Sequence, residues 1–206
     1  MKAREATDAR RARGDRTRRR IAYRAAERAS LVGLQAVSLG VLAQDLGLSK
    51  SGIATLYGSK QDLQLAAVAA ATDTFIQHVI EPAATAPPGL PRLNTLIDAW
   101  LDYVRRPVFP GGCFMVATAA EFDSQPGPVR DALAQGRRSW LATLAREVAH
   151  AQDAGQLTGL PADLVAFEIE AILAAANIAA NLFDDPDALT TARHILNLRV
   201  GDPTPG

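Results

Sequence analysis

The stretch LAQDLGLSKSGIATLYGSK, residues 42–60, reads as two short helices joined by a glycine turn. Gly47 stands where the chain must turn tightly, and glycine adopts the left-handed backbone conformation that a β-carbon resists. Ser38 and Ser49 are suitable N-caps for the helices on either side of this turn. A third serine, Ser59, precedes a further helical segment. The pattern predicts a helix-turn-helix.

The second of these two helices has an unusual outer face. On a helical wheel, Ile53, Leu56 and Tyr57 fall together on the side that faces the rest of the chain. The opposite side carries small and hydroxylic residues, although Gly and Ser lower helix stability and a solvated face usually carries long charged residues. Such a face suits a close approach by another surface, and the DNA major groove, about 12 Å wide, admits a helix. We expect this helix to enter the groove, as the second helix of a helix-turn-helix does.

Several residues on and around this unit are candidates for contact with DNA. Hydroxyl groups bond base edges or phosphates, and the methyl groups of Ala and Thr can contact the thymine methyl. The N-terminal amides of a helix can bind a phosphate, and Lys and Arg add charged contacts. The predicted DNA-binding residues are Arg18, Arg19, Ser38, Ser49, Lys50, Ser51, Gly52, Thr55, Tyr57 and Lys60.

Charge is unevenly distributed along the chain, although the formal net charge is zero. Residues 1–30 hold eleven Lys or Arg against four Asp or Glu, whereas residues 71–206 hold nine against sixteen. A basic N-terminal segment in a chain whose remainder is acidic indicates that this segment binds a polyanion. For residues 1–15 alone, the lack of apolar periodicity favours a disordered, solvated arm.

The remaining chain shows helical periodicity and no strand-like alternation, so we expect an all-α fold. The segment 82–92 contains four prolines and is expected to be a connector rather than a helix. The expected helices cover roughly residues 16–32, 39–46, 50–57, 60–81, 93–105, 114–124, 129–154, 162–183 and 187–199. The predicted organisation is a disordered basic arm (1–15), a helix-turn-helix DNA-binding domain (16–62), a helical effector-binding and dimerisation domain (63–200) and a disordered tail (201–206).

Composition excludes several classes of protein. No run approaches the roughly 18 to 20 apolar residues of a membrane span, and the Arg-rich start is no secretory signal. We therefore expect a cytoplasmic protein with no membrane partner. No Gly-rich phosphate loop, Gly-x-Ser-x-Gly motif or metal-ligand spacing is present in the sequence, so we expect no enzyme, no cofactor and no metal. The single cysteine, Cys113, is either a small packing residue or, near a helix start, a thiol of lowered pKa.

The sequence resembles the N-terminal domain of the TetR/AcrR family of bacterial transcriptional regulators over roughly residues 16–70. Residues 110–133, PGGCFMVATAAEFDSQPGPVRDAL, also resemble the C-terminal domain of one TetR subgroup. The matching positions in the first region are Gly33, Ser38, Leu42-Ala43, Gly47-Leu48-Ser49-Lys50, Tyr57, Ser59-Lys60 and Leu63.

The resemblance implies a homodimer that binds a double-stranded DNA operator and is released by a small-molecule effector. The aromatic and apolar residues of the C-terminal half favour a hydrophobic or aromatic effector. The predicted ligand-binding residues are Trp100, Tyr103, Phe114, Met115, Thr118, Phe122, Trp140, Asn177 and Asn181. Apolar positions of the last two helices exceed what one core needs, which is consistent with a dimer interface. The predicted dimerisation residues are Leu164, Ile169, Ile172, Ala176, Ala180, Ile195 and Leu196.

The chain departs from the family pattern within the recognition helix. Ala54 stands where the family usually has an aromatic residue that contacts phosphate, and Leu56 stands where histidine is common. Thr55 then has to provide more of the polar contacts of this helix with DNA. The function predicted is a ligand-responsive DNA-binding regulator, a repressor by expectation. The alternative is a helical small-molecule-binding or protein-interaction module whose DNA binding has weakened.

Overall fold

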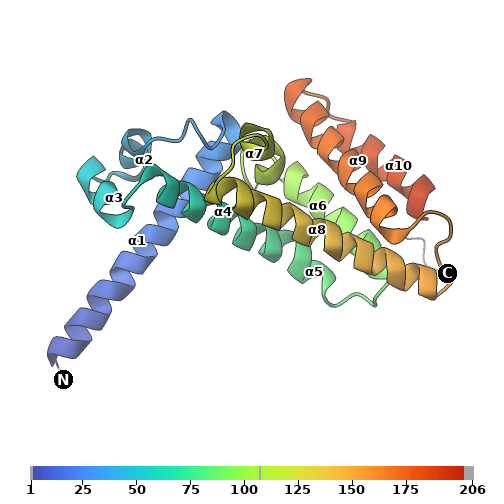
Figure 1. Cartoon of the computed structure of the whole chain (residues 1–206), viewed down its shortest axis with the longest axis horizontal. Coiled ribbons are helices and arrows are strands. Elements are labelled where there is room, and N and C mark those ends of the chain that lie inside the picture. Colours follow the sequence, from blue (N-terminus) through green and yellow to red (C-terminus); the bar gives the residue numbers. More distant parts are fainter. Residues whose placement is uncertain (1, 107, 202–206) are drawn as a thin grey trace.

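The computed structural model describes residues 2–106 and 108–201, with side chains described from residue 12 onward. All regular structure in this part of the chain is helical (Figure 1), which confirms the all-α fold. The helices are α1 Lys2–Val32, α2 Leu39–Leu46, α3 Lys50–Leu56, α4 Lys60–Phe75, the π-helical segment η1 Ile76–Ile80, α5 Glu81–Ala83, α6 Leu90–Arg105, α7 Phe114–Phe122, α8 Pro128–Asp153, α9 Ala162–Leu182 and α10 Ala188–Val200.

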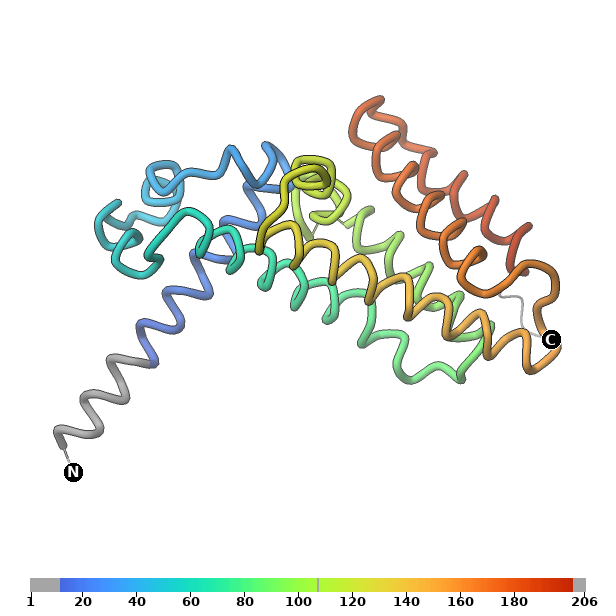
Figure 2. Tube along the Cα trace, in the orientation of Figure 1, coloured from blue at the N-terminus to red at the C-terminus, as the bar shows by residue number. Residues whose placement is uncertain are grey.

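The expected division into a helix-turn-helix unit and a larger helical domain is visible along the length of the molecule. The short helices α2 and α3 lie beside α1 at one end, and α9 and α10 run side by side at the other (Figures 1 and 2). Between them, α8 packs on α4, α6 and α9. The helix α1 packs along α4 and against α7, so it connects the helix-turn-helix end to the middle of the molecule.

Helix α1 begins at Lys2, within the segment expected to be a disordered arm over residues 1–15. Residues 2–13 contain no Gly or Pro and are rich in Ala and Arg, which are among the best helix formers. Ile21 and Ala25 are fully buried and fix the later turns of α1 in the core. Extending a helix that is already nucleated costs little, so propensity continues it without an apolar stripe.

The helix that starts at Lys60 continues to Ala83, past Pro82, where the sequence predicts a break. A proline ring normally clashes with the carbonyl four residues earlier. The preceding turn is π-helical, and the Glu81 N–H bonds the Ile76 carbonyl, five residues back. This shift in hydrogen-bond register accommodates the proline. The other helix bounds agree with expectation to within a few residues, and residues 202–206 of the expected tail lie outside the described residues.

The stretch Lys60–Ala83 is, within the described residues, also the one helix that is long and apolar enough to cross a membrane by composition. About a third of this apolar window is buried inside the protein. Leu63, Ala67 and Val68 are buried and belong to the hydrophobic core that runs through both parts of the molecule. Packing therefore accounts for part of its apolar composition.

The loop before α7 is held tightly between α1 and α9 by two glycines. The Gly111 N–H donates to Ser30 Oγ at 3.0 Å, and a β-carbon at this position would overlap the Ser30 backbone. Gly112 has a φ of +82°, and a β-carbon there would collide with Asn177. The sequence Gly111-Gly112 therefore permits an approach that no larger residue allows.

A second contact ties α7 to the helix-turn-helix through Glu121. Its Oε1 accepts from the Leu34 N–H at 2.7 Å and its Oε2 from the Gln35 N–H at 2.8 Å. The Gln35 side chain donates in return to the Glu121 carbonyl at 3.2 Å. We call this set of bonds the Glu121 junction. It joins α7 to the turn between α1 and α2.

Candidate functional site

The three predicted N-caps of the helix-turn-helix region are confirmed. Ser38 Oγ accepts from the Val41 N–H at 3.3 Å, and Ser49 Oγ accepts from the Gly52 N–H at 3.0 Å. Ser59 Oγ accepts from the Asp62 N–H at 3.1 Å. Gly47 ends α2 in the left-handed conformation, with a φ of +64°. The turn chemistry read from residues 42–60 is therefore the chemistry that shapes this unit.

The two faces of α3 are also as predicted. Ile53 is fully buried and Leu56 is half-buried, so this side packs on the rest of the domain. The exposed residues of the helix are Lys50, Ser51, Gly52, Ala54 and Thr55. Thr55 donates its hydroxyl to the Ser51 carbonyl at 2.8 Å, so its methyl group and oxygen lone pairs remain for an outside partner.

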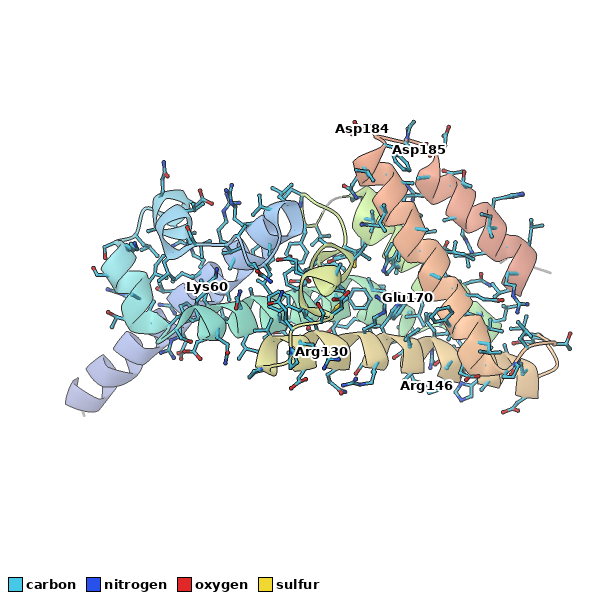
Figure 3. The ribbon with its side chains drawn as sticks, turned by 45° about the horizontal axis from the view of Figure 1, so that its top comes forward. Lys60, Arg130, Arg146, Glu170, Asp184 and Asp185 are labelled. Carbon is cyan, nitrogen blue, oxygen red and sulfur yellow. The ribbon has the colours of Figure 1, made fainter. Side chains whose placement is uncertain are left out.

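Two predicted DNA-binding residues have partners inside the protein. Tyr57 is buried, and its hydroxyl donates to the Arg18 carbonyl on α1 at 2.7 Å. It therefore connects α3 to α1, and its contact with DNA stays a prediction. Lys60 stays exposed at the start of α4 (Figure 3), although its Nζ donates to the Gln35 carbonyl at 2.5 Å. Arg18 and Arg19 are exposed on α1.

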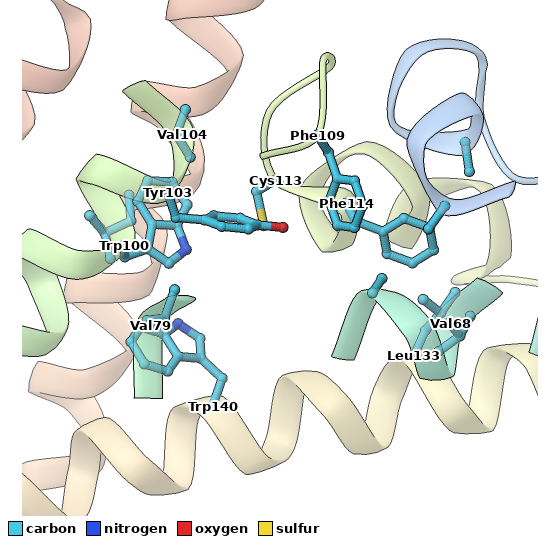
Figure 4. Packing of buried hydrophobic residues seen from close by; sticks show 14 of the residues in the cluster. Val68, Val79, Trp100, Tyr103, Val104, Phe109, Cys113, Phe114, Leu133 and Trp140 are labelled. Carbon is cyan, nitrogen blue, oxygen red and sulfur yellow. The ribbon is translucent and has the colours of Figure 1, made fainter. Parts of the chain in front are cut away.

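A small cavity of about 70 Å³ lies between α4, α6, α7, α8 and α9. Five of the predicted ligand-binding residues line it. They are Trp100, Tyr103, Phe114, Met115 and Trp140. Phe75 joins them from α4 and packs edge-on against Tyr103 and Trp140, at ring-centroid distances of 5.8 and 5.2 Å. Figure 4 shows how closely these aromatic side chains gather.

The polar anchors expected for the effector make hydrogen bonds within the fold. Thr118 is fully buried and donates to the Phe114 carbonyl at 2.9 Å. Asn177 accepts from the Cys113 N–H at 2.8 Å, and Asn181 donates to the Asn177 carbonyl at 2.7 Å. Phe122 lines a separate, more open groove between α7, α8 and α9. None of these four residues lines the aromatic cavity.

The charged pair of the cavity wall was missed by sequence reasoning. Arg137 on α8 donates to Glu170 on α9, with 2.7 Å between Arg137 Nη2 and Glu170 Oε2. The Glu170 side chain is 8% exposed and the Arg137 side chain 41%, so the pair closes the cavity from its outer side. Figure 3 shows Glu170 between α9 and the body of the domain. Because the two residues stand 33 positions apart on different helices, no local pattern marks them.

Cys113 lines the same cavity as a packing residue. The side chain is buried, and burial raises the pKa of its thiol, although the N–H groups of Val116 and Met115 act in the opposite direction. A thiolate of lowered pKa at the helix start is therefore the wrong alternative. The other alternative, a small buried packing residue, is confirmed.

An apolar surface runs along α9 and α10 at the far end of the molecule. Its members are 44 to 78% exposed, although they are large hydrophobic residues. We call it the α9–α10 apolar face, and it consists of Leu164, Phe167, Ile178, Leu182, Phe183, Ile195 and Leu198. An exposed patch of this kind marks an interaction surface.

The predicted dimerisation residues divide between this face and the core. Leu164 and Ile195 belong to the face, and Ile172 and Ala180 are half-buried. Ile169, Ala176 and Leu196 are buried within the monomer and belong to its core. Both helices carry apolar residues on more than one side, and a helical wheel does not show which side meets the core.

Comparison with known proteins supports this architecture. The family described as "Tetracyclin repressor-like, C-terminal domain" matches residues 89–196, which is more than half of the chain. The protein therefore belongs to the TetR family of transcriptional regulators. No protein of curated function matches the sequence.

Solved structures of the same fold cover nearly the whole chain. A TetR transcriptional regulator from Chloroflexus aurantiacus J-10-FL is 24% identical, with a TM-score of 0.83 over 90% of this chain and 94% of that one. A putative regulator from Saccharomonospora viridis in complex with choline is 20% identical, with a TM-score of 0.78 over 89% and 94%. AibR in complex with isovaleryl coenzyme A and operator DNA is 16% identical, with a TM-score of 0.73 over 89% and 98%. At these identities the likeness shows the fold.

Proposed function

We propose that this protein is a ligand-responsive repressor that binds a palindromic DNA operator as a homodimer and leaves it when a small effector binds. The observation that carries the proposal is the outer face of α3. Ser51, Gly52, Ala54 and Thr55 are all exposed on a helix whose other side is buried. A short helix of this shape fits a major groove with its N-terminal residues at the base edges.

The surroundings of α3 supply charge for the DNA backbone. Lys50 and Lys60 are exposed beside it, and Arg18 and Arg19 are exposed on α1. Lys and Arg near a duplex release counterions from phosphates, so binding through these residues weakens as salt rises. These contacts position the helix, while Thr55 and its neighbours read bases. AibR, which shares the fold, has been seen with operator DNA.

The α9–α10 apolar face supports a two-fold dimer. Large exposed side chains such as Phe167 and Leu198, 60% and 78% exposed, are stabilised by burial against a second copy of the same face. A dimer of this kind places two α3 helices on one side of the DNA, where they address successive turns of a palindromic site. Because its target is DNA, we expect the protein to work in the cytoplasm.

The effector is proposed to bind the aromatic cavity, whose wall includes the start of α7. The far end of α7 carries Glu121, which holds the backbone between α1 and α2. An effector that prefers the DNA-incompetent form tenfold supplies about 1.4 kcal/mol of coupling. Through the Glu121 junction, a change at the cavity end of α7 acts directly on the helix-turn-helix.

The test is fluorescence anisotropy on DNA from upstream of the protein's own coding region, against scrambled DNA of equal length, at about 50 and 200 mM salt. A specific regulator prefers one fragment by about 10³ or more and loses affinity steeply as salt rises. Equal, weak binding to all upstream fragments and to scrambled DNA would favour the alternative of a ligand-binding module with weakened DNA binding.

A further inference from the structure

The walls of the aromatic cavity carry hydrogen-bond donors. Trp100 and Trp140 both line the cavity. In Figure 4 the two indole nitrogens lie on the ring edges that face each other. An indole nitrogen is a donor only. Each N–H can therefore donate to an acceptor on a molecule bound in the cavity.

The Tyr103 hydroxyl is a third donor of this kind. It points toward Cys113, which lines the same cavity (Figure 4). The Phe114 N–H lies within reach of the hydroxyl oxygen as a donor, so the hydroxyl proton can go to a bound molecule. Burial raises the pKa of Tyr103 far above its ordinary value, with a smaller effect of Cys113, so the phenol keeps its proton. The hydroxyl of Thr72, also in the wall, is already used on the Val68 carbonyl at 2.9 Å.

The charges of the cavity balance each other. Arg137 and Glu170 are paired at 2.7 Å, and they are the only charged residues of the wall within the described chain. A charged ligand would bring an uncompensated charge into an apolar space, at a cost of several kcal/mol. A ring system with a neutral acceptor oxygen avoids this cost and stacks on the aromatic walls.

We propose that the cavity binds an uncharged, flat aromatic compound whose carbonyl-type oxygen accepts hydrogen bonds from Trp100, Trp140 and Tyr103. The inference rests on the proposed function only in taking this compound as the effector. The main rival is a cation held by the aromatic rings. The exposed guanidinium donors of Arg137 at the mouth oppose a cation, and the wall donors would find no acceptor on it.

The experiment uses four one-ring probes that differ in one group: acetophenone, ethylbenzene, benzoate and phenyltrimethylammonium. Because the chain has two tryptophans and both line the cavity, a ¹⁵N-labelled sample gives two indole N–H signals that report on this site. Single Trp→Phe variants assign the signals. Tyr103→Phe removes one donor without changing ring volume, and its melting temperature verifies that it folds.

We expect acetophenone to move both indole proton signals downfield and to bind about tenfold more tightly than ethylbenzene, since a hydrogen bond adds up to this factor. The difference in affinity between acetophenone and ethylbenzene should become smaller in the Tyr103→Phe variant. Equal binding of acetophenone and ethylbenzene would overturn the role of the donors. Tighter binding of benzoate or of phenyltrimethylammonium would overturn the uncharged class.

Binding of none of the four probes would overturn the cavity as a ligand site. The proposed DNA function is tested without any ligand, by the preference of the protein for one DNA fragment. Specific DNA binding with no probe binding would therefore count against this inference alone.

Discussion

At the scale of single residues, one side of α3 packs on the rest of the domain and the opposite side is exposed. Tyr57 reaches from the end of α3 to the Arg18 carbonyl at 2.7 Å, and Ile53 is fully buried beneath the helix. These contacts leave few ways for α3 to tilt, so the exposed side chains keep their spacing. A fixed spacing is what base readout in the groove requires.

Thr55→Ala should weaken binding to the specific DNA fragment by about tenfold and leave binding to scrambled DNA unchanged, because a base contact adds discrimination of about 1–3 kcal/mol. The matched control is Thr143→Ala on α8. Thr143 donates to the Ser139 carbonyl at 2.9 Å in the same four-residue pattern that Thr55 makes. Anisotropy titrations measure the affinity of both variants for the specific and the scrambled DNA. An equal loss of affinity for both DNAs in Thr55→Ala would contradict a base contact by Thr55.

Glu147 gives a prediction for pH. The side chain is fully buried, and burial by itself raises the pKa of its carboxyl. Hydrogen bonds from the Gly89 N–H, Arg146 and His150, with Arg92 nearby, outweigh burial and hold the pKa below its ordinary value of 4.5. A lowered pKa in the folded state contributes stability that is complete above pH 4.5 and is lost as pH falls further.

Glu147→Gln should therefore lower the free energy of unfolding by about 2 kcal/mol at neutral pH, the size of hydrogen bonds to a charged group. The difference between wild type and variant should shrink as pH falls below 4.5. Urea unfolding of both proteins at pH 7 and near pH 3.5 measures it. A difference that stays constant over this interval would show that the carboxylate charge of Glu147 does not stabilise the fold.

At the scale of helices, α7 is the element that touches both functional regions. Phe114 and Met115 at its start line the cavity, and Glu121 near its end binds the Leu34 and Gln35 amides. The loop before it is fixed by Gly111 against Ser30 on α1. A displacement of α7 by an effector therefore acts on α1 and on the turn that follows it.

Glu121→Gln should loosen this connection, since the amide NH₂ cannot accept from a backbone N–H as the carboxylate oxygen does. We expect hydrogen exchange at Leu34 and Gln35 to rise by about tenfold, the effect of losing about 1.4 kcal/mol of local stability. Gln125→Ala is the control, because Gln125 donates only to the Glu121 carbonyl, at 2.6 Å. Unchanged exchange in Glu121→Gln, or equal changes in both variants, would contradict the role of the Glu121 junction.

The elements that could be predicted from the sequence are those that local chemistry determines. Caps at Ser38, Ser49 and Ser59 and the turn at Gly47 depend on neighbours within a few residues, and all were predicted. The Arg137–Glu170 pair and the bond from Cys113 to Asn177 join residues 33 and 64 positions apart. Such contacts depend on how helices pack, which a single sequence does not reveal.

The orientation of α9 is a second feature that the sequence alone did not predict. Its apolar residues surround the helix, so periodicity identified the helix and not its buried face. Ile169 is fully buried, while Phe167 and Ile178 are exposed. The dimerisation residues were therefore drawn partly from the core and partly from the surface. The N-terminal part of α1 was missed for a different reason, because helix propensity there acts without any apolar pattern.

At the scale of the whole molecule, the α9–α10 apolar face lies at the opposite end from α3 (Figure 1). In the proposed dimer, a two-fold axis through this face would relate two helix-turn-helix units, and the distance between them would set the operator spacing. We therefore expect specific binding to depend on dimerisation, because one α3 helix carries few base contacts.

Phe167→Glu should convert the dimer to a monomer at micromolar concentration, since it places a charge at a position that dimerisation would bury. Sedimentation velocity measures the mass of wild type and variant. The control is Ile76→Glu on η1, another large exposed hydrophobic residue at 40%, which lies outside the α9–α10 apolar face. Dimers in both variants would place the interface elsewhere on the protein.

We expect two copies of α3 to enter neighbouring major grooves of one DNA site. Hydroxyl-radical footprinting on the fragment selected by anisotropy measures this arrangement. Two protected segments related by two-fold symmetry should appear, with centres about 10 base pairs apart or a multiple of that distance. A single protected segment, or uniform protection without symmetry, would contradict it.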